Sequence, residues 1–214
     1  MSAADILAIL QGAATTATLS LTAICLGLPL GLALALARWA NIPIVAPFVA
    51  VYVSILRATP LVTLLLLLFF ALPSIGVPIG AVAAALVALT MNTSAFNCEV
   101  WRAGLMNFPK DQFEAAQSVG MRRRQRLQRI VLPQVLRACL PGLVNEISLL
   151  IKVTPVLAVV GVVDITRAAV RIGAETYDPL PPLLVALAIY VPMVYAIVRV
   201  ARLTERRLAQ TEAA

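Results

Sequence analysis

Long stretches of this 214-residue chain carry no charged side chain, or almost none, and they constrain its fold more than any other feature. A helix needs roughly 20 apolar residues to cross the hydrocarbon core of a bilayer, which is about 30 Å thick. The stretches are residues 6–37, 58–98, 138–163 and 179–198. Overall, 61% of the residues are hydrophobic and 13% are charged, whereas a soluble domain has about 45–50% apolar and about 25% charged residues. The chain is therefore a membrane protein, and its composition excludes a disordered chain and a disulfide-stapled secreted module.

We predict an all-α, polytopic membrane protein with about five transmembrane helices. The predicted spans are residues 14–37, 47–72, 79–103, 134–160 and 181–203. The longest uncharged stretch has room for two of them, and Pro73, Gly76 and Pro78 mark the turn between the two.

Basic residues indicate how these spans are oriented. With five spans, all but three of the 17 Lys and Arg side chains fall on one side of the membrane. The exceptions are Arg167 and Arg171 on the other side and Lys152 inside a span. Because loops rich in Lys and Arg stay in the cytoplasm, we expect the N-terminus outside, and residues 104–133 and the C-terminus inside. Topology thus explains the net charge of +7, and we expect the lipid bilayer, not nucleic acid, as the partner of this charge.

Small residues suggest which spans pack together. Gly27 and Gly31 form a GxxxG pattern in the first span, and the third span opens with alanines. In lipid, small residues let helices approach closely, so we expect these two spans to pack together. The second span has a bulky run, residues 64–70, and we expect it to face lipid or a partner subunit.

Groups needed for catalysis or metal binding are scarce. The chain has no His, and its three cysteines, Cys25, Cys98 and Cys139, all lie in apolar spans without a CxxC pattern. We therefore expect them to pack as small apolar residues, and we expect no metal site and no disulfide. The cytoplasmic parts contain neither a Gly-rich phosphate loop nor a carboxylate cluster. The chain alone is not expected to be an enzyme.

The substantial non-membrane segment is residues 104–133. Asp111 and Glu114 fit a capping box at the start of a helix of about two turns. Ala115 and Ala116 would give this helix a small, flat face, and Gly120 would end it in the left-handed conformation. A basic stretch follows, formed by Arg122, Arg123, Arg124, Arg126 and Arg129. One alternative for this stretch is a solvated linker lying on anionic lipid headgroups.

This segment resembles the cytoplasmic EAA loop of bacterial ATP-binding-cassette (ABC) import permeases. That family has the pattern EAA-x3-G-x9-I-x-LP. The chain matches every fixed position, with Glu114, Ala115, Ala116, Gly120, Ile130, Leu132 and Pro133. The match falls on the loop that the topology prediction places in the cytoplasm.

Further motifs are similar to those of the polar amino-acid uptake branch of that family, which includes histidine, arginine, glutamine, glutamate and opine systems. They are Tyr52-Val53, Arg57-Ala58-Thr59-Pro60-Leu61, Ala95-Phe96 with Glu99 and Arg102, Leu132-Pro133-Gln134, and Lys152-x-Thr154. The resemblance covers residues 12–208, a single permease domain. The chain departs from the branch at Ala58, Asp111 and residues 153–156, so the resemblance does not indicate which amino acid is carried.

The resemblance implies a set of partners and a location. Two permease subunits, identical or different, would enclose the path, an ABC ATPase dimer would bind beneath them, and an external solute-binding protein would deliver a polar amino acid. Magnesium-ATP would bind to the ATPase, and this chain would hold no cofactor. It would lie in the bacterial cytoplasmic (inner) membrane. The coupling residues would be Glu114, Ala115, Ala116 and Gly120.

Ionisable groups within spans cost free energy and are functional candidates. The candidate translocation path consists of Arg57, Thr59, Asn92, Glu99, Lys152 and Thr154. Arg57 and Lys152 each open a similar pentad whose proline can break a helix and expose backbone polar groups. Alternatively, Glu99 pairs with Arg102 one turn on, and Arg57 extends to the inner membrane surface.

Three other functions remain to be compared. An ion-coupled secondary transporter would need buried carboxylates, which Glu99 and Glu146 partly supply, but it would leave the EAA pattern unexplained. An intramembrane enzyme would lack His and paired catalytic carboxylates. An ABC permease for another class of solute is disfavoured only by the motifs in the second and fourth spans.

Overall fold

The structure is a computed structural model that describes residues 1–210, and all regular elements in that range are helical. The helices are α1 (Ala3–Trp39), α2 (Val45–Ala58), α3 (Leu61–Ser74), α4 (Ala81–Met106), α5 (Lys110–Ser118), α6 (Arg123–Arg126), α7 (Leu132–Val153), α8 (Ile165–Thr176) and α9 (Leu180–Gln210). A π turn, Leu127–Val131, joins α6 to α7, and a 3₁₀ helix, Thr154–Val160, follows α7. The all-α prediction is confirmed.

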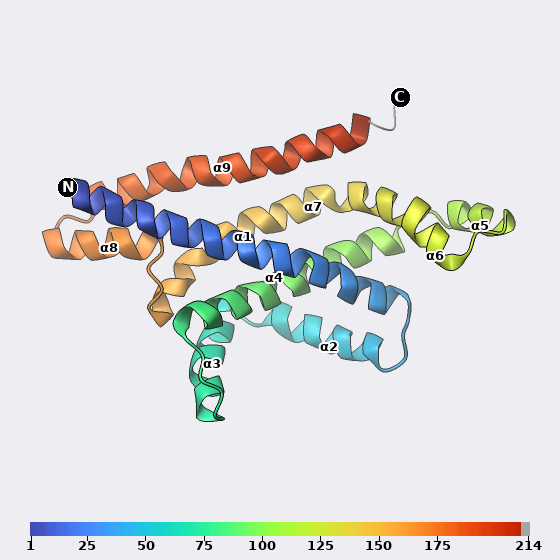
Figure 1. Ribbon diagram of the computed structural model, residues 1–214, viewed down its shortest axis with the longest axis horizontal. Coiled ribbons are helices and arrows are strands. Elements are labelled where there is room, and N and C mark those ends of the chain that lie inside the picture. The colour runs from blue at the N-terminus through green and yellow to red at the C-terminus, as the bar shows by residue number, and fades with distance from the viewer. Residues whose placement is uncertain (211–214) are drawn as a thin grey trace.

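Four of the helical segments are long and apolar enough to cross a membrane, and the pair α2 and α3 makes up to a fifth span. This agrees with the prediction of about five. Figure 1 shows the long helices side by side, with α5 and α6 at one end of the molecule. The N-terminus and α8 lie at the opposite end. Which end faces the cytoplasm stays a prediction.

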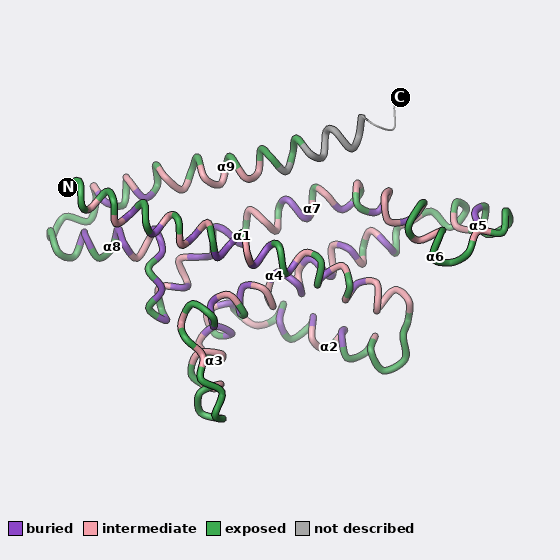
Figure 2. The backbone as a smooth tube through the Cα atoms, in the orientation of Figure 1, coloured by how far each residue is buried: buried purple, intermediate pink, exposed green. Residues whose placement is uncertain are grey.

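Helices α1 and α4 form the centre of the bundle, as the small residues predicted. A Cβ atom at Gly27 would lie 2.7 Å from the Thr93 side chain, and one at Gly31 would lie 2.9 Å from the Ser94 carbonyl oxygen. The backbones therefore meet at distances that only glycine allows. In Figure 2 the buried stretches of the chain gather along this crossing, whereas α9 is mostly exposed or partly exposed.

The second predicted span, residues 47–72, is wrong as a single helix. It is broken between α2 and α3, which differ in direction by 107°, and in Figure 1 α3 projects away from the bundle. Thr59 is extended at the break, with φ −93° and ψ 126°. The cause is Pro60, which lacks a backbone N–H and disfavours helical geometry at the residue before it.

The fourth span also changes character at its proline pentad. The α-helix ends at Val153, and residues 154–160 continue as a 3₁₀ helix around Pro155. At its other end, Pro133 is the second residue of α7 and directly follows the π turn within a continuous helical segment. Both pentads thus coincide with interruptions of regular α-helix, as their prolines indicated.

Helix α8 was not predicted. Asp164 caps it by accepting hydrogen bonds from the backbone N–H groups of Thr166 and Arg167. One face packs into a second apolar cluster with Ile9 of α1 and Ala186 of α9. The repeat of its buried residues, Ile165, Ala168, Ala169, Ile172 and Gly173, is the amphipathic signal that would have identified it.

Candidate functional site

The segment with the EAA pattern forms α5 and the turn after it. The predicted capping box at Asp111 is wrong, because the N-cap is Pro109, two residues earlier, and no side chain caps the helix. Proline fixes φ near the value that a helix start requires, and this displaces Asp111 into the first turn. There its carboxylate still favours the helix by interacting with the positive end of the helix dipole.

The turn after α5 forms as predicted. Gly120 has φ +78°, a left-handed conformation that other residues adopt only at a cost. The N–H of Gly120 donates to the Gln117 carbonyl at 3.0 Å, and that of Met121 donates to the Ala116 carbonyl at 3.2 Å. This pair of hydrogen bonds is a Schellman motif, which ends the helix and satisfies its last carbonyls.

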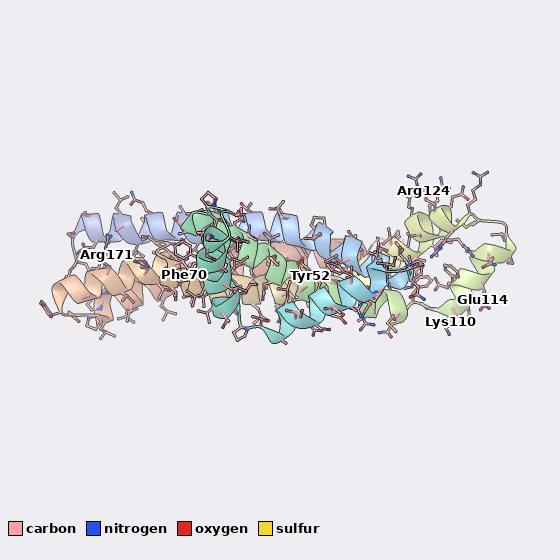
Figure 3. All side chains as sticks on the ribbon, turned by 90° about the horizontal axis from the view of Figure 1, so that it is seen from below. Tyr52, Phe70, Lys110, Glu114, Arg124 and Arg171 are labelled. Atoms are coloured by element: carbon pink, nitrogen blue, oxygen red, sulfur yellow. The ribbon has the colours of Figure 1, made fainter. Side chains whose placement is uncertain are left out.

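The two alanines of α5 do not form one common exposed face. Ala116 is buried within this chain, at 5% exposure, whereas Ala115 and Glu114 are exposed. Successive residues of a helix point about 100° apart, so only one alanine of an adjacent pair lies on the outer surface. Glu114 and Lys110 lie at the end of the molecule opposite Arg171 (Figure 3).

Three contacts fix α5 against other elements. The Gln134 side chain of α7 donates to Gln112 at 2.8 Å. The Phe113 ring packs edge-on against Trp39 of α1, and the guanidinium of Arg126 lies over its face. The helix is thus an exposed element with a defined orientation.

The basic stretch after α5 is distant, along the axis of the helical segment that contains it, from the part of the bundle where the charged residues of α1 and α4 lie. On α7, Cys139 marks this part of the bundle, because its thiol donates to the carbonyl of Val100, the residue after Glu99 on α4, at 3.3 Å. Arg124 precedes Arg137 by 13 positions in the helical segment 123–160, which at 1.5 Å per residue is about 20 Å. Figure 3 shows the Arg124 side chain extending away from the ribbon. Whether this stretch lies on lipid headgroups, in solvent or against a protein stays a prediction.

The candidate path residues do not lie in one place. Glu99 of α4 lies in a charge cluster in which it forms ion pairs with Arg38 of α1 and Arg102, the latter at 2.7 Å. Arg57 of α2 lies 4.0 Å from the same carboxylate and 5.4 Å from the centre of the Phe96 ring. Glu99 is therefore satisfied inside the chain, and the alternative in which it pairs with Arg102 is the one observed.

Lys152 lies in a different place, a groove of about 930 Å³ between α7 and α9. The groove is lined by Ser148, Lys152, Pro155, Leu187, Tyr190, Val191, Val194, Tyr195, Val198, Arg199, Arg202 and Leu203. Lys152 itself is exposed. Three cationic side chains (Lys152, Arg199 and Arg202), hydroxyl groups and apolar walls together suit a small solute with a carboxylate.

The remaining candidates do not line that groove. Thr154 is buried, and its hydroxyl donates to the Ile151 carbonyl at 2.8 Å and lies 3.4 Å from the Tyr190 hydroxyl. The Thr59 hydroxyl donates to the Ile55 carbonyl at 2.8 Å. Asn92 is partly buried on α4. The structure therefore does not bring the six candidates into one site.

Sequence reasoning missed Trp39, Phe113 and Arg126 as partners of one another, and Tyr190 as a residue of the groove. Tyr190 lies within hydrogen-bond distance of Thr154, Thr166 and Asp164 at 3.3–3.4 Å. A single aromatic residue in an apolar span gives no signal of this kind, because its partners are distant in sequence.

Comparison with known proteins identifies what this arrangement is similar to. Residues 27–210 match the protein family described as "Binding-protein-dependent transport system inner membrane component". The arginine transport system permease protein ArtQ of Bacillus subtilis (strain 168) is 35% identical over 208 residues, covering 95% of this chain and 94% of ArtQ. The putative glutamine transport system permease protein GlnP of Rickettsia typhi is 33% identical over 204 residues, with the same coverage of both chains.

The fold has a counterpart among solved structures. A chain in a crystal structure of an amino acid ABC transporter with histidines superimposes with a TM-score of 0.85. It is 32% identical in sequence, and the match covers 94% of each chain.

Proposed function

Because this chain belongs to the family of binding-protein-dependent transport system inner membrane components, we propose that it is the permease subunit of an ATP-driven importer of a polar amino acid. Relatives named as arginine and glutamine transport permeases support this substrate class. The chain would form half of a transmembrane path, with a second permease subunit as the other half. A solute-binding protein would supply the amino acid from outside.

The observation that supports this function most strongly is the geometry of α5. It is a short exposed helix at one end of the molecule, held by contacts to α1, α6 and α7. A helix held in this way can transmit a displacement that a partner imposes on its exposed side. Glu114 and Ala115 are the exposed residues of the EAA pattern, and we assign them to the contact with the ATPase subunit. Gly120 would set the angle at which the chain leaves that contact.

In this proposal the ATPase subunits hydrolyse ATP. Magnesium-ATP would bind between the ATPase subunits, and this chain would contribute neither a cofactor site nor a catalytic residue. The end that carries α5 would face the cytoplasm, and the chain would lie in the inner membrane of a bacterium.

We propose the groove between α7 and α9 as the place where the amino acid passes. The Lys152 ammonium would attract the substrate carboxylate, and the apolar wall from α9 would contact its side chain. Such binding should be weak, because a transported solute must also leave. Thr154 would act indirectly by holding the 3₁₀ segment to Tyr190.

Reconstitution tests the proposal. The chain, co-purified with its ATPase and any second permease subunit, is placed in liposomes with the solute-binding protein on the outside, and uptake of radiolabelled arginine, glutamine and histidine is measured. We expect uptake of at least one of them only when magnesium-ATP is present at the ATPase side. Uptake that persists without ATP and follows an ion gradient would instead identify a secondary transporter.

A further inference from the structure

We propose that Phe113 is a positioning residue that transmits the displacement of α5 to the membrane helices, through its edge-on contact with Trp39. The inference rests on the proposed function, since it concerns how the coupling helix acts. It assigns the mechanical connection to a side-chain contact rather than to the chain that joins α4 to α5.

The geometry holds Phe113 on two sides. Its ring centre lies 6.4 Å from that of Trp39, and the two ring planes are 83° apart. The guanidinium of Arg126 lies 4.3 Å from the centre of the Phe113 ring. Edge-to-face packing and a cation over the ring are both favourable and both depend on direction. A shift of α5 must therefore move its neighbours or lose these contacts.

Arg126 makes α5 and α6 a single unit. Besides covering Phe113, it donates a hydrogen bond of 2.6 Å to the side chain of Gln117. Phe113 and Gln117 are four residues apart, so they share one face of the helix. Because α6 continues into α7, α5 has a connection to α7 as well as to α1.

Trp39 leads directly to the charge cluster. Its neighbour in sequence, Arg38, forms the ion pair with Glu99 of α4, and Glu99 is 4.0 Å from Arg57 of α2. The last turn of α1 thus contacts the coupling helix through one residue and the core helix α4 through the next. This sequence of contacts runs from α5 through α1 to α4 and α2.

The competing route is the covalent one. Only residues 107–109 separate α4 from α5, so α5 could pull on α4 without any side-chain contact. The two routes make different predictions for Phe113, because removing its ring leaves the covalent connection intact.

The test uses the complete importer in proteoliposomes, with ATP hydrolysis and amino-acid uptake measured in the same vesicles. For Phe113→Leu we expect the amount of amino acid imported per ATP to fall about fivefold or more, the usual size of a coupling effect. The hydrolysis rate and the yield of assembled complex should stay close to those of the unmodified importer.

A second pair of variants keeps the test valid if Phe113→Leu assembles poorly. Trp39→Phe keeps an aromatic ring against Phe113 and should retain most of the coupling, whereas Trp39→Leu should lose it. Phe70→Leu is the matched control, because Phe70 also packs edge-on, against Phe69 with 5.1 Å between ring centres. Phe69 and Phe70 lie on α3, which is remote from α5 in Figure 1.

The outcomes distinguish a failure of the inference about Phe113 from a failure of the proposed function. If Phe113→Leu and Trp39→Leu import as much per ATP as the unmodified importer, the inference is overturned and the proposed function stands. If both variants lose hydrolysis and complex formation together with uptake, Phe113 serves docking, and the inference is again overturned. If the unmodified complex shows no ATP-dependent uptake, the proposed function itself fails.

Discussion

Arg38 in the last turn of α1 and Glu99 in the C-terminal third of α4 form an ion pair between residues 61 positions apart. The same carboxylate accepts hydrogen bonds of 2.9 and 2.7 Å from Arg102. Glu99, which is partly buried, thus links α4 to α1. A third basic residue, Arg57 of α2, lies 4.0 Å from the same carboxylate. The position of α1 relative to α4 depends on this charge as well as on Gly27 and Gly31, which lie earlier in α1.

Glu99→Gln should destabilise the protein by about 1–3 kcal/mol, because it leaves partly buried arginines without their counter-charge. The measurement is the thermal unfolding midpoint of the detergent-purified subunit. Glu175→Gln is the control, since Glu175 pairs with Arg171 at 3.7 Å with both side chains more than half exposed. Exposed ion pairs contribute little to stability. If Glu175→Gln lowered the unfolding midpoint as much as Glu99→Gln, this account would be contradicted.

Gly31→Ala should separate α1 from α4. The added Cβ would lie 2.9 Å from the Ser94 carbonyl oxygen and 3.1 Å from the Cys98 nitrogen, and these backbone atoms cannot move aside. We expect a loss of about 1–3 kcal/mol in stability, measured in the same way. Leu30→Ala on the neighbouring exposed position should have little effect. An unchanged midpoint for Gly31→Ala would show that the helices are not closely packed there.

Gly120→Val should lower uptake while the protein still inserts into the membrane and assembles. Nothing lies within 4 Å of a Cβ atom at Gly120, so the cost comes from the left-handed backbone alone, about 1–2 kcal/mol. The turn would then change its angle. Gly120→Asn is the matched control, because asparagine tolerates this conformation. Normal uptake by the valine variant would refute a coupling role for the turn.

Lys152→Met should raise the KM for uptake roughly tenfold or more, as expected for the loss of one charge-assisted hydrogen bond. ATP hydrolysis without substrate should be unchanged, since Lys152 lies in the groove between α7 and α9, away from α5. Lys152→Arg keeps the charge and should recover part of the affinity. If Lys152→Met imports with an unchanged KM, the groove is not the substrate path.

The parts of the fold that could be predicted from sequence depend on local signals. Runs without charge predicted the spans, Gly27 and Gly31 predicted the pairing of α1 with α4, and Gly120 predicted the end of α5. The break at Pro60 was visible as a possible interruption, but its angle of 107° depends on how α3 packs.

Individual side-chain pairs between distant residues could not be predicted, although the pairing of α1 with α4 could. From sequence, Arg38 indicates only topology, because nothing in the sequence relates it to Glu99. The same holds for Trp39 and Phe113, which are 74 positions apart in the chain. The burial of Ala116 also depends on tertiary packing, so the EAA pattern alone suggested a flat face of two alanines where one is exposed.

The most direct test of the central claim is whether α5 touches the ATPase subunit. Ala115→Cys is made in a Cys25→Ala background, because Cys25 is the exposed one of the three native cysteines. A short reagent with a thiol-reactive group at one end and a photoactivated group at the other is added to membranes that contain the assembled importer, and light then joins it to whatever lies beside position 115. We predict a cross-link from position 115 to the ATPase and none from Val170→Cys, an exposed position on α8 at the other end of the molecule. A cross-link from position 170, or labelling of position 115 by an impermeant thiol reagent added outside intact cells, would contradict the account.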